Sequence, residues 1–234
     1  MKKTFQTIFL LTLVAGVLNV HAQSSKNFIV KSFNTISVSS GIDLYLSQGS
    51  SESVNIKTDA ETMASVVVEQ EGQSIRIKFK DGFSWSRAFK NRSIKAYVNF
   101  KNINGLNASG GSDVYSQNPI KTDKLTINSS GGSDLKLDLI CGDLSVSSSG
   151  GSDLDLSGKV QNLVIHSSGG SDVDAFNLVA QYAKVESSGG SDVNVNVEKG
   201  IEAGASGGSD ITYKGNAGLR KTSSSKSGSV RHTD

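Results

Sequence analysis

The chain contains very few residues of several types that commonly stabilise protein domains or form their active sites. Among its 234 residues there are one cysteine, one proline and one tryptophan. A single cysteine, Cys141, excludes an intramolecular disulfide, and the Cys and His residues have no spacing typical of a zinc site. Packing must therefore stabilise the fold, and a chain of this length can form a substantial core.

Long apolar runs are also absent, apart from one near the N-terminus. Two lysines precede an apolar stretch over residues 8–20, and Val20 and Ala22 provide the small residues of a cleavage site. This pattern is typical of a signal peptide, so we expect residues 1–22 to be removed and the mature chain to begin at Gln23. No later stretch is apolar for about 18 residues, so we expect no membrane span. The expected location is the periplasm, the cell surface or the extracellular space.

An excess of one charge is absent as well. Two of the 24 basic residues lie in the leader, so 22 basic residues balance 22 acidic ones in the mature chain. This balance gives no support for nucleic-acid binding. His166 and His232 are the histidines that remain, and neither lies in a cluster of residues typical of a metal site or a catalytic base.

The most abundant feature is a glycine-rich motif that recurs along the chain. The segment Ser129–Leu135 reads SSGGSDL, and a weaker copy, SSGIDL, begins at Ser39. A recurrence of about 20 residues is typical of a solenoid in which each repeat packs on its neighbours. The motif aspartate recurs at intervals of 21, 19, 19, 20 and 18 residues, at Asp113, Asp134, Asp153, Asp172, Asp192 and Asp210.

Side chains alternate within each repeat in the way expected of strands. In one copy Leu125, Ser129 and Gly131 share one parity, and Asp134 and Lys136 share the other. A period of two is the pattern of a β-strand with one buried face. Strict alternation places the first glycine of each motif inside, unless a positive φ at the glycines interrupts the pattern.

The end repeats give an independent indication of an interior column. The first inward serine of the motif is replaced by Ala108 in the first copy and by Ala205 in the last. A position that accepts only serine or alanine indicates a tight interior space. Helical spacing is absent from the repeats, and only residues 59–65 are expected to form a helical turn.

The repeat length predicts the fold class. A unit of about 19 to 20 residues, at about 3.3 Å per strand residue, can circle a small core once, and successive circuits would pair in parallel about 4.8 Å apart. We predict an all-β, single-stranded, right-handed parallel β-helix, or β-solenoid, with the handedness taken from the crossover rule. We expect the domain to span 23–213, with six regular GGSD circuits over 103–213. Residues 214–234 are expected to add a last strand and then fray.

Stacking would place the six motif aspartates in a line, where like charges about 4.8 Å apart repel by roughly 1 kcal/mol per pair. Backbone N–H groups or serine hydroxyls that donate to the carboxylates would offset this repulsion. Alternatively, Ca²⁺ would lie between the carboxylates, which makes all six candidate metal ligands. We favour the structural role, because calcium-loaded β-rolls use a different nonapeptide twice per turn. No other cofactor is expected.

One segment, residues 79–100, differs from the repeats because aromatic and basic residues alternate in it. Its aromatic residues either cap the open end of the solenoid, which we favour, or form a binding surface. In the second case a glycan or anionic polymer would stack on aromatic rings and pair with arginines. The candidate ligand-binding residues are Phe83, Trp85, Arg87 and Arg92.

Several segments together carry a resemblance to a known family. They are the leader, SSGIDLYL over Ser39–Leu46 with Gln48 and Gly49 after it, SIRI over Ser74–Ile77, AYV over Ala96–Val98, and the repeats. The chain resembles the putative auto-transporter adhesin, head GIN domain family of exported proteins in Gram-negative bacteria, over roughly residues 32–213. The resemblance implies a single β-helical domain and an adhesin role, with no catalytic residue to carry over.

The function expected from these features is a non-catalytic adhesion or scaffold module at the bacterial cell envelope. Its partner would be an extracellular glycan or a surface protein. A Ca²⁺-assisted carbohydrate-binding protein is the first alternative, and a polysaccharide lyase or hydrolase is the second. An enzyme is disfavoured because the carboxylates recur uniformly instead of clustering once, and because the repeats contain no arginine that could serve as a base.

Overall fold

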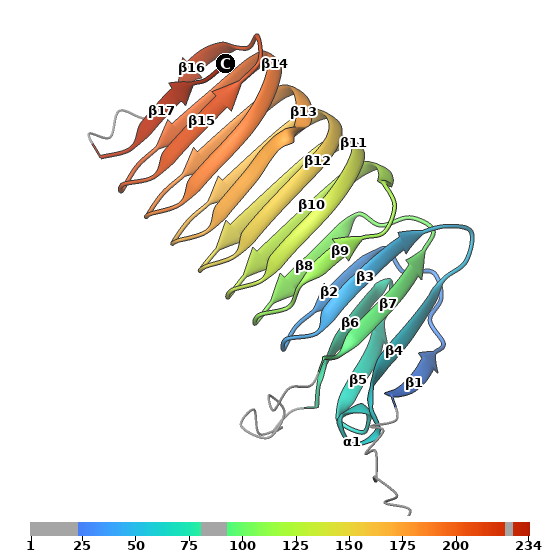
Figure 1. Ribbon diagram of the computed structural model, residues 1–234. Coiled ribbons are helices and arrows are strands. Elements are labelled where there is room, and N and C mark those ends of the chain that lie inside the picture. Colours follow the sequence, from blue (N-terminus) through green and yellow to red (C-terminus); the bar gives the residue numbers. More distant parts are fainter. Residues whose placement is uncertain (1–22, 81–92, 223–226) are drawn as a thin grey trace, which may run out of the picture.

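The computed structural model describes residues 23–80, 93–222 and 227–234. It is nearly all-β, with 68% strand and 2% helix, and its stacked parallel strands form an elongated solenoid of about seven turns (Figure 1). This architecture confirms the predicted fold class. In the part of the chain that the structure describes, no helix has the length and apolar character needed to cross a membrane.

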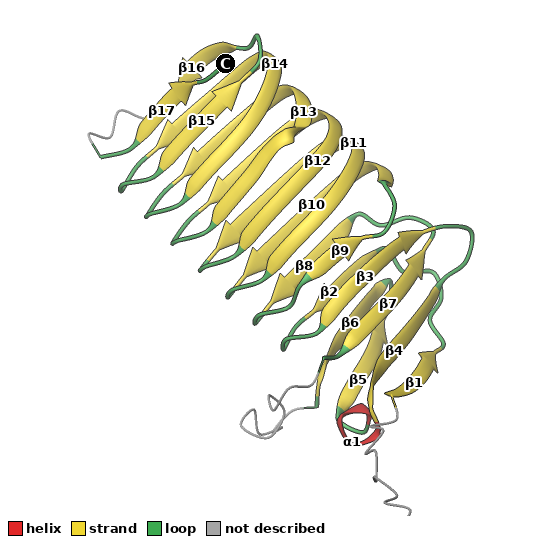
Figure 2. Ribbon diagram, in the orientation of Figure 1, coloured by secondary structure: helices red, strands yellow, loops and turns green. Residues whose placement is uncertain are grey.

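Short strands form both ends of the chain, and the long strands β10 to β14 lie between them (Figure 2). The elements are β1 (Gln23–Phe28), β2 (Thr35–Val38), β3 (Asp43–Gln48), β4 (Ser53–Asp59), α1 (Ala60–Met63), β5 (Val66–Glu71), β6 (Ser74–Phe79), β7 (Lys95–Phe100), β8 (Gly105–Ser109), β9 (Val114–Ser116), β10 (Ile120–Ser130), β11 (Asp134–Ser149), β12 (Asp153–Ser167), β13 (Asp172–Ser187), β14 (Asp192–Ala205), β15 (Asp210–Lys214), β16 (Gly218–Lys221) and β17 (Ser229–His232).

The strands form two faces of the solenoid. The first face consists of β5, β6, β2, β8, the C-terminal parts of β10 to β14, and β16. The second consists of β1, β4, β7, β3, β9, the N-terminal parts of β11 to β14, β15 and β17. Strands β11 to β14 contribute to both faces, so each repeat makes one lap.

The strand register stacks equivalent residues of successive laps. Asp134 pairs with Asp153, which pairs with Asp172, and the same registers bring Leu135 beside Leu154. Inward positions are filled by Leu, Ile and Val side chains with almost no exposed surface. Burying one such side chain contributes about 1.5–3 kcal/mol to the free energy of unfolding. The apolar columns therefore stabilise the fold without disulfides.

The N-terminal end departs from the all-parallel pattern. Strand β4 adds antiparallel to β7, β1 adds antiparallel to β4, and β5 adds antiparallel to β6. The expected helical turn is confirmed as α1, with Asp59 as its N-cap accepting from the Thr62 amide at 3.0 Å. Phe79 and Phe100 are buried in the core at this end.

The segment after Lys214 contributes two strands, whereas we expected one. Strand β16 pairs with β14 on the first face, and β17 pairs with β15 on the second. Together they complete a final lap.

Candidate functional site

The SSGGSD motif forms the turn between the two faces, and its first and third serines point inward. Ser148 and Ser152 are at most 2% exposed, and their hydroxyl oxygens lie 2.9 Å apart. The Ser152 hydroxyl also donates to the Ser149 carbonyl at 3.1 Å. We call this arrangement the serine clasp. It satisfies hydroxyl groups that would otherwise be buried without partners, and it holds the turn closed.

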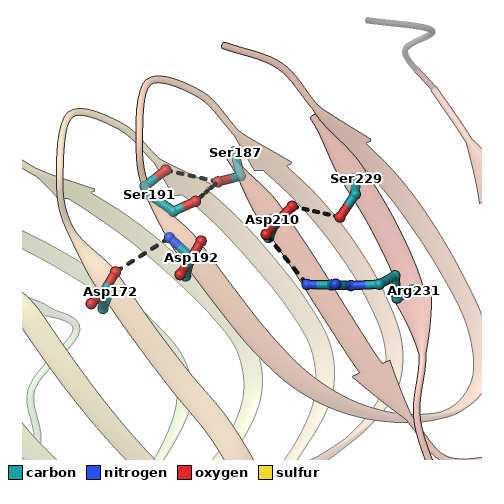
Figure 3. Close-up of polar contacts among 7 residues, drawn as sticks. All are labelled: Asp172, Ser187, Ser191, Asp192, Asp210, Ser229 and Arg231. Atoms are coloured by element: carbon teal, nitrogen blue, oxygen red, sulfur yellow. Dashed lines mark hydrogen bonds and ion pairs between the residues drawn. The ribbon is translucent and has the colours of Figure 1, made fainter. Parts of the chain in front are cut away.

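The serine clasp recurs in neighbouring laps. The hydroxyl oxygens of Ser167 and Ser171 lie 2.9 Å apart. Those of Ser187 and Ser191, drawn in Figure 3, lie 2.7 Å apart. In the last motif Ala205 replaces the first serine, and the Ser209 hydroxyl lies 2.8 Å from the Ser206 carbonyl oxygen of its own turn and 2.9 Å from the Ser187 carbonyl oxygen of the preceding lap. The prediction of a tight interior serine column is confirmed.

The motif glycines correct one part of the alternation pattern. Strict alternation placed Gly131, Gly150 and Gly169 inside, but all three are exposed, with φ of 68°, 82° and 80°. A positive φ turns the chain outward for the two glycine positions and returns it inward at the following serine. The assignments of the leucines and valines are unaffected.

The motif aspartates form the predicted column on the second face. Asp43 of the weaker motif copy joins the column beside Asp113, because the residues that follow these two aspartates, Leu44 and Val114, pair in register. The column therefore begins beside Lys95, the register partner of Asp43, and ends at Asp210, whose register partner is Ser229.

Several carboxylates of this column have hydrogen-bond donors (Figure 3). The Asp192 amide donates to the Asp172 carboxylate at 3.3 Å. Asp210 accepts from the Ser229 hydroxyl, and an Arg231 guanidinium nitrogen lies 3.3 Å from it. These donors are of the kind that we expected to offset the repulsion between neighbouring carboxylates.

At the N-terminal end of the column two carboxyl groups have raised pKa values. Burial raises the pKa of Asp43 above its ordinary value. Burial, and then the nearby charge of Asp43, raise the pKa of Asp113, although the Tyr115 hydroxyl donates to it at 3.4 Å. Among the described residues, no group of three or more His, Cys, Asp or Glu side chains converges as a metal site would require. The role of the six aspartates as cation ligands stays a prediction.

A stack of tyrosines lies beside the aspartate column and was not predicted. The rings of Tyr45 and Tyr97 are 5.0 Å apart between centroids, and those of Tyr45 and Tyr115 are 5.3 Å apart. The Lys57 ammonium lies 4.8 Å from the centre of the Tyr97 ring. The sequence contains an indication of this stack, because Tyr45 and Tyr115 each follow a motif aspartate by two residues.

The tyrosine stack ends beside a shallow hollow. Tyr115 lines a hollow of about 340 Å³ together with Lys136, Asp138 and Ser157. Lys136 continues the column of Tyr115 on the next lap, and its ammonium lies 2.8 Å from Asp155. Aromatic and charged groups thus follow one another along this face.

The other predicted binding residues cannot be placed. Phe83, Trp85, Arg87 and Arg92 lie outside the described residues. On the first face, His166 lies 3.2 Å from Glu186, and Lys184 lies 3.0 Å from the same carboxylate.

Comparisons with known proteins agree with this architecture. A putative adhesin from Bacteroides fragilis has a TM-score of 0.83 at 26% identity, covering 91% of this chain and 97% of that one. A putative adhesin from Parabacteroides distasonis has a TM-score of 0.68 at 21% identity, covering 92% and 98%. A putative lipid binding protein from the same organism has a TM-score of 0.68 at 20% identity, covering 91% and 97%. The two Parabacteroides structures support the fold alone.

A search of curated proteins found no match. The family model described as putative auto-transporter adhesin, head GIN domain matches residues 32–217. The chain belongs to this family.

Proposed function

We propose that the protein is an exported, non-catalytic adhesion or scaffold module at the envelope of a Gram-negative bacterium. The family and the name of the Bacteroides neighbour support an adhesion-type module. The observation that carries the proposal is the serine clasp. The polar groups that recur most often, such as those of Ser167 and Ser171, bond to one another and to the turn inside the fold. This bonding supports a structural role for the buried serines of the motif.

Binding by an extended outer surface is consistent with the rest of the structure. The second face displays the aspartate column, the tyrosine stack and the Lys136–Asp155 ion pair side by side. Stable protein interfaces bury about 800 Å² on each partner, and a long solenoid face can supply such an area. An extracellular glycan or a surface protein is the partner class that we propose.

Attachment of cells tests this function. A strain that lacks the gene should attach less to surfaces coated with glycans or matrix proteins, and the gene with its leader intact should restore attachment. Digestion of intact cells by an added protease tests location, since an exported surface protein should be cleaved while a cytoplasmic marker is spared. Unchanged attachment of the deletion strain would contradict the adhesion role.

Purified protein separates the alternatives. A glycan and matrix-protein array probed with and without calcium distinguishes simple adhesion from Ca²⁺-assisted carbohydrate binding. Release of reducing ends or unsaturated products from polysaccharides would instead identify a hydrolase or lyase, and would overturn the non-catalytic proposal.

A further inference from the structure

The first face carries an exposed aromatic residue that neither the core nor the tyrosine stack uses. Tyr182 of β13 is 48% exposed. The strand register places it beside Gly200 of β14, which in turn lies beside Gly218 of β16. A Cβ at Gly200 would lie 3.5 and 3.8 Å from two carbons of the Tyr182 ring. The ring therefore leans over a strand that has no side chain at this position.

The backbone does not require glycine at either position. Neither Gly200 nor Gly218 has a positive φ, and a Cβ at Gly218 would have no atom within 4 Å. A side chain would fit there, yet the chain has none on two consecutive laps. The effect of both glycines is to keep the surface open next to the ring. Glycine inside a strand marks a bulge, a bend or a place where a ligand or another backbone approaches closely. The register between β13 and β14 shifts just before Gly200, whereas Gly218 pairs with Gly200 in a regular register.

The open space is a hollow of about 400 Å³, within the range of about 300–1,000 Å³ that is typical of small-ligand sites. We call it the Tyr182 hollow. Its lining comes from four successive strands, β12, β13, β14 and β16, and the Tyr182 ring forms one wall. Its principal lining residues are Asn162, Tyr182, Lys184, Gly200, Gly218 and Arg220.

Hydrogen-bonding groups follow one side of the hollow. Lys184, Glu202 and Arg220 are in register on three successive strands, and Arg220 and Glu202 form an ion pair at 2.6 Å. The Lys199 ammonium lies 5.7 Å from the centre of the Tyr182 ring. The hollow thus combines an aromatic surface with a row of donors and acceptors.

This combination matches the chemistry of a pyranose ring. One face of a pyranose consists largely of C–H groups that pack on an aromatic ring, and its edge carries hydroxyls that both donate and accept hydrogen bonds. An extended peptide fits less well, because β13 is paired with β12 and β14 and offers it no free backbone groups.

We propose that the Tyr182 hollow binds a pyranose unit of an oligosaccharide. The sugar packs against Tyr182 and lies over Gly200 and Gly218, and its hydroxyls bond to the row formed by Lys184 and the Arg220–Glu202 pair. The hollow is open to solvent, so the chain can extend beyond the bound unit. The proposal rests on the proposed adhesion function in so far as this saccharide is the adhesion partner.

The test measures binding of the whole mature chain to a panel of neutral and uronic-acid-containing pyranose oligosaccharides by calorimetry. We expect saturable binding to at least one of them. Tyr182→Ala should weaken it at least tenfold, because the packing surface is lost, whereas Tyr182→Phe should retain it. Gly218→Val should fold normally, since a Cβ meets no atom there, and should abolish binding by filling the hollow.

The matched control is Ile140→Ala, which removes an apolar side chain of similar exposure, 46%, from outside the hollow. It should leave affinity unchanged, and circular dichroism should confirm that every variant is folded. The proposal is overturned if no oligosaccharide binds, if the wild type binds only peptides or proteins, or if Tyr182→Ala and Gly218→Val bind as the wild type does.

Failure of this proposal and failure of the adhesion role give different results. Loss of attachment in the deletion strain without any saccharide binding by the pure protein would refute the Tyr182 hollow alone. Saccharide binding that depends on Tyr182, in a protein whose deletion leaves attachment unchanged, would refute the adhesion role alone.

Discussion

The two glycines of one motif copy should respond very differently to the same substitution. Gly189 has a φ of 80°, and a Cβ there would lie 2.8 Å from the Gly169 carbonyl oxygen and 2.9 Å from the Gly169 nitrogen of the preceding lap. Its neighbour Gly190 has no positive φ, and the nearest atom to a Cβ there is 3.7 Å away. At Gly189 both the positive φ and the close contact with the preceding lap require glycine, whereas neither applies at Gly190.

The magnitude follows from these contacts. An alanine in the left-handed region costs roughly 1–2 kcal/mol, and forcing an atom into closely packed backbone costs about 1–3 kcal/mol more. Gly189→Ala should therefore lower the free energy of unfolding by about 2–5 kcal/mol. Gly190→Ala should leave it unchanged or raise it by up to about 1 kcal/mol, because alanine restricts the unfolded chain.

Urea denaturation followed by far-ultraviolet circular dichroism measures both variants against the wild type. The pair is well matched, since the same methyl group is added at adjacent positions of one turn. Equal stabilities of the two variants would refute the stacking of this turn on the preceding lap.

Three further predictions concern packing, charge and metal. Leu156→Ala should lower the free energy of unfolding by about 2–5 kcal/mol in the same assay, because the side chain is fully buried. Asp113→Asn should raise the melting temperature at neutral pH. Burial and the charge of Asp43 raise the pKa of Asp113, so the folded wild type loses stability as the pH rises through that pKa. The difference in melting temperature between variant and wild type should therefore vanish as the pH falls below the ordinary pKa of 3.8. A higher melting temperature of the variant that persists in acid would contradict this cause. The wild type should have the same melting temperature in millimolar calcium as in a chelator, because among the described residues no three ligating side chains converge. A higher melting temperature in calcium would favour the aspartates as cation ligands.

Much of the repeat fold could be predicted because its determinants are local and periodic. The recurrence of Asp134 and its equivalents sets one lap per unit, and the parity of Leu125 and Ser129 sets which side chains point inward. The glycines could not be assigned by parity, because a positive φ interrupts the alternation at Gly131 and its equivalents.

The N-terminal end was harder to predict because the repeat does not extend into it. Strands β1, β4 and β5 pair antiparallel, and the β5–β6 hairpin turns at Gly72, where φ is 57°. No GGSD motif marks these strands, so nothing in the repeat pattern indicates their direction.

The candidate sites depended on contacts between laps more than on local sequence. The tyrosine stack becomes visible only when the Asp43 and Asp113 copies are aligned. The Tyr182 hollow depends on Gly200 and Gly218, which are far from Tyr182 in sequence and carry no side chain that a motif search would notice. Recognition of such a site requires the register.

Distances along the aspartate column test most directly whether each repeat makes one lap. With Cys141 replaced by valine, spin labels at positions 113 and 210 should lie five strand spacings apart, about 24 Å along the axis. Moving the first label from 113 to 134 and then to 153 should shorten the separation by about 4.8 Å at each step. A separation that stays constant, or that changes irregularly as the label moves, would contradict the stacked solenoid.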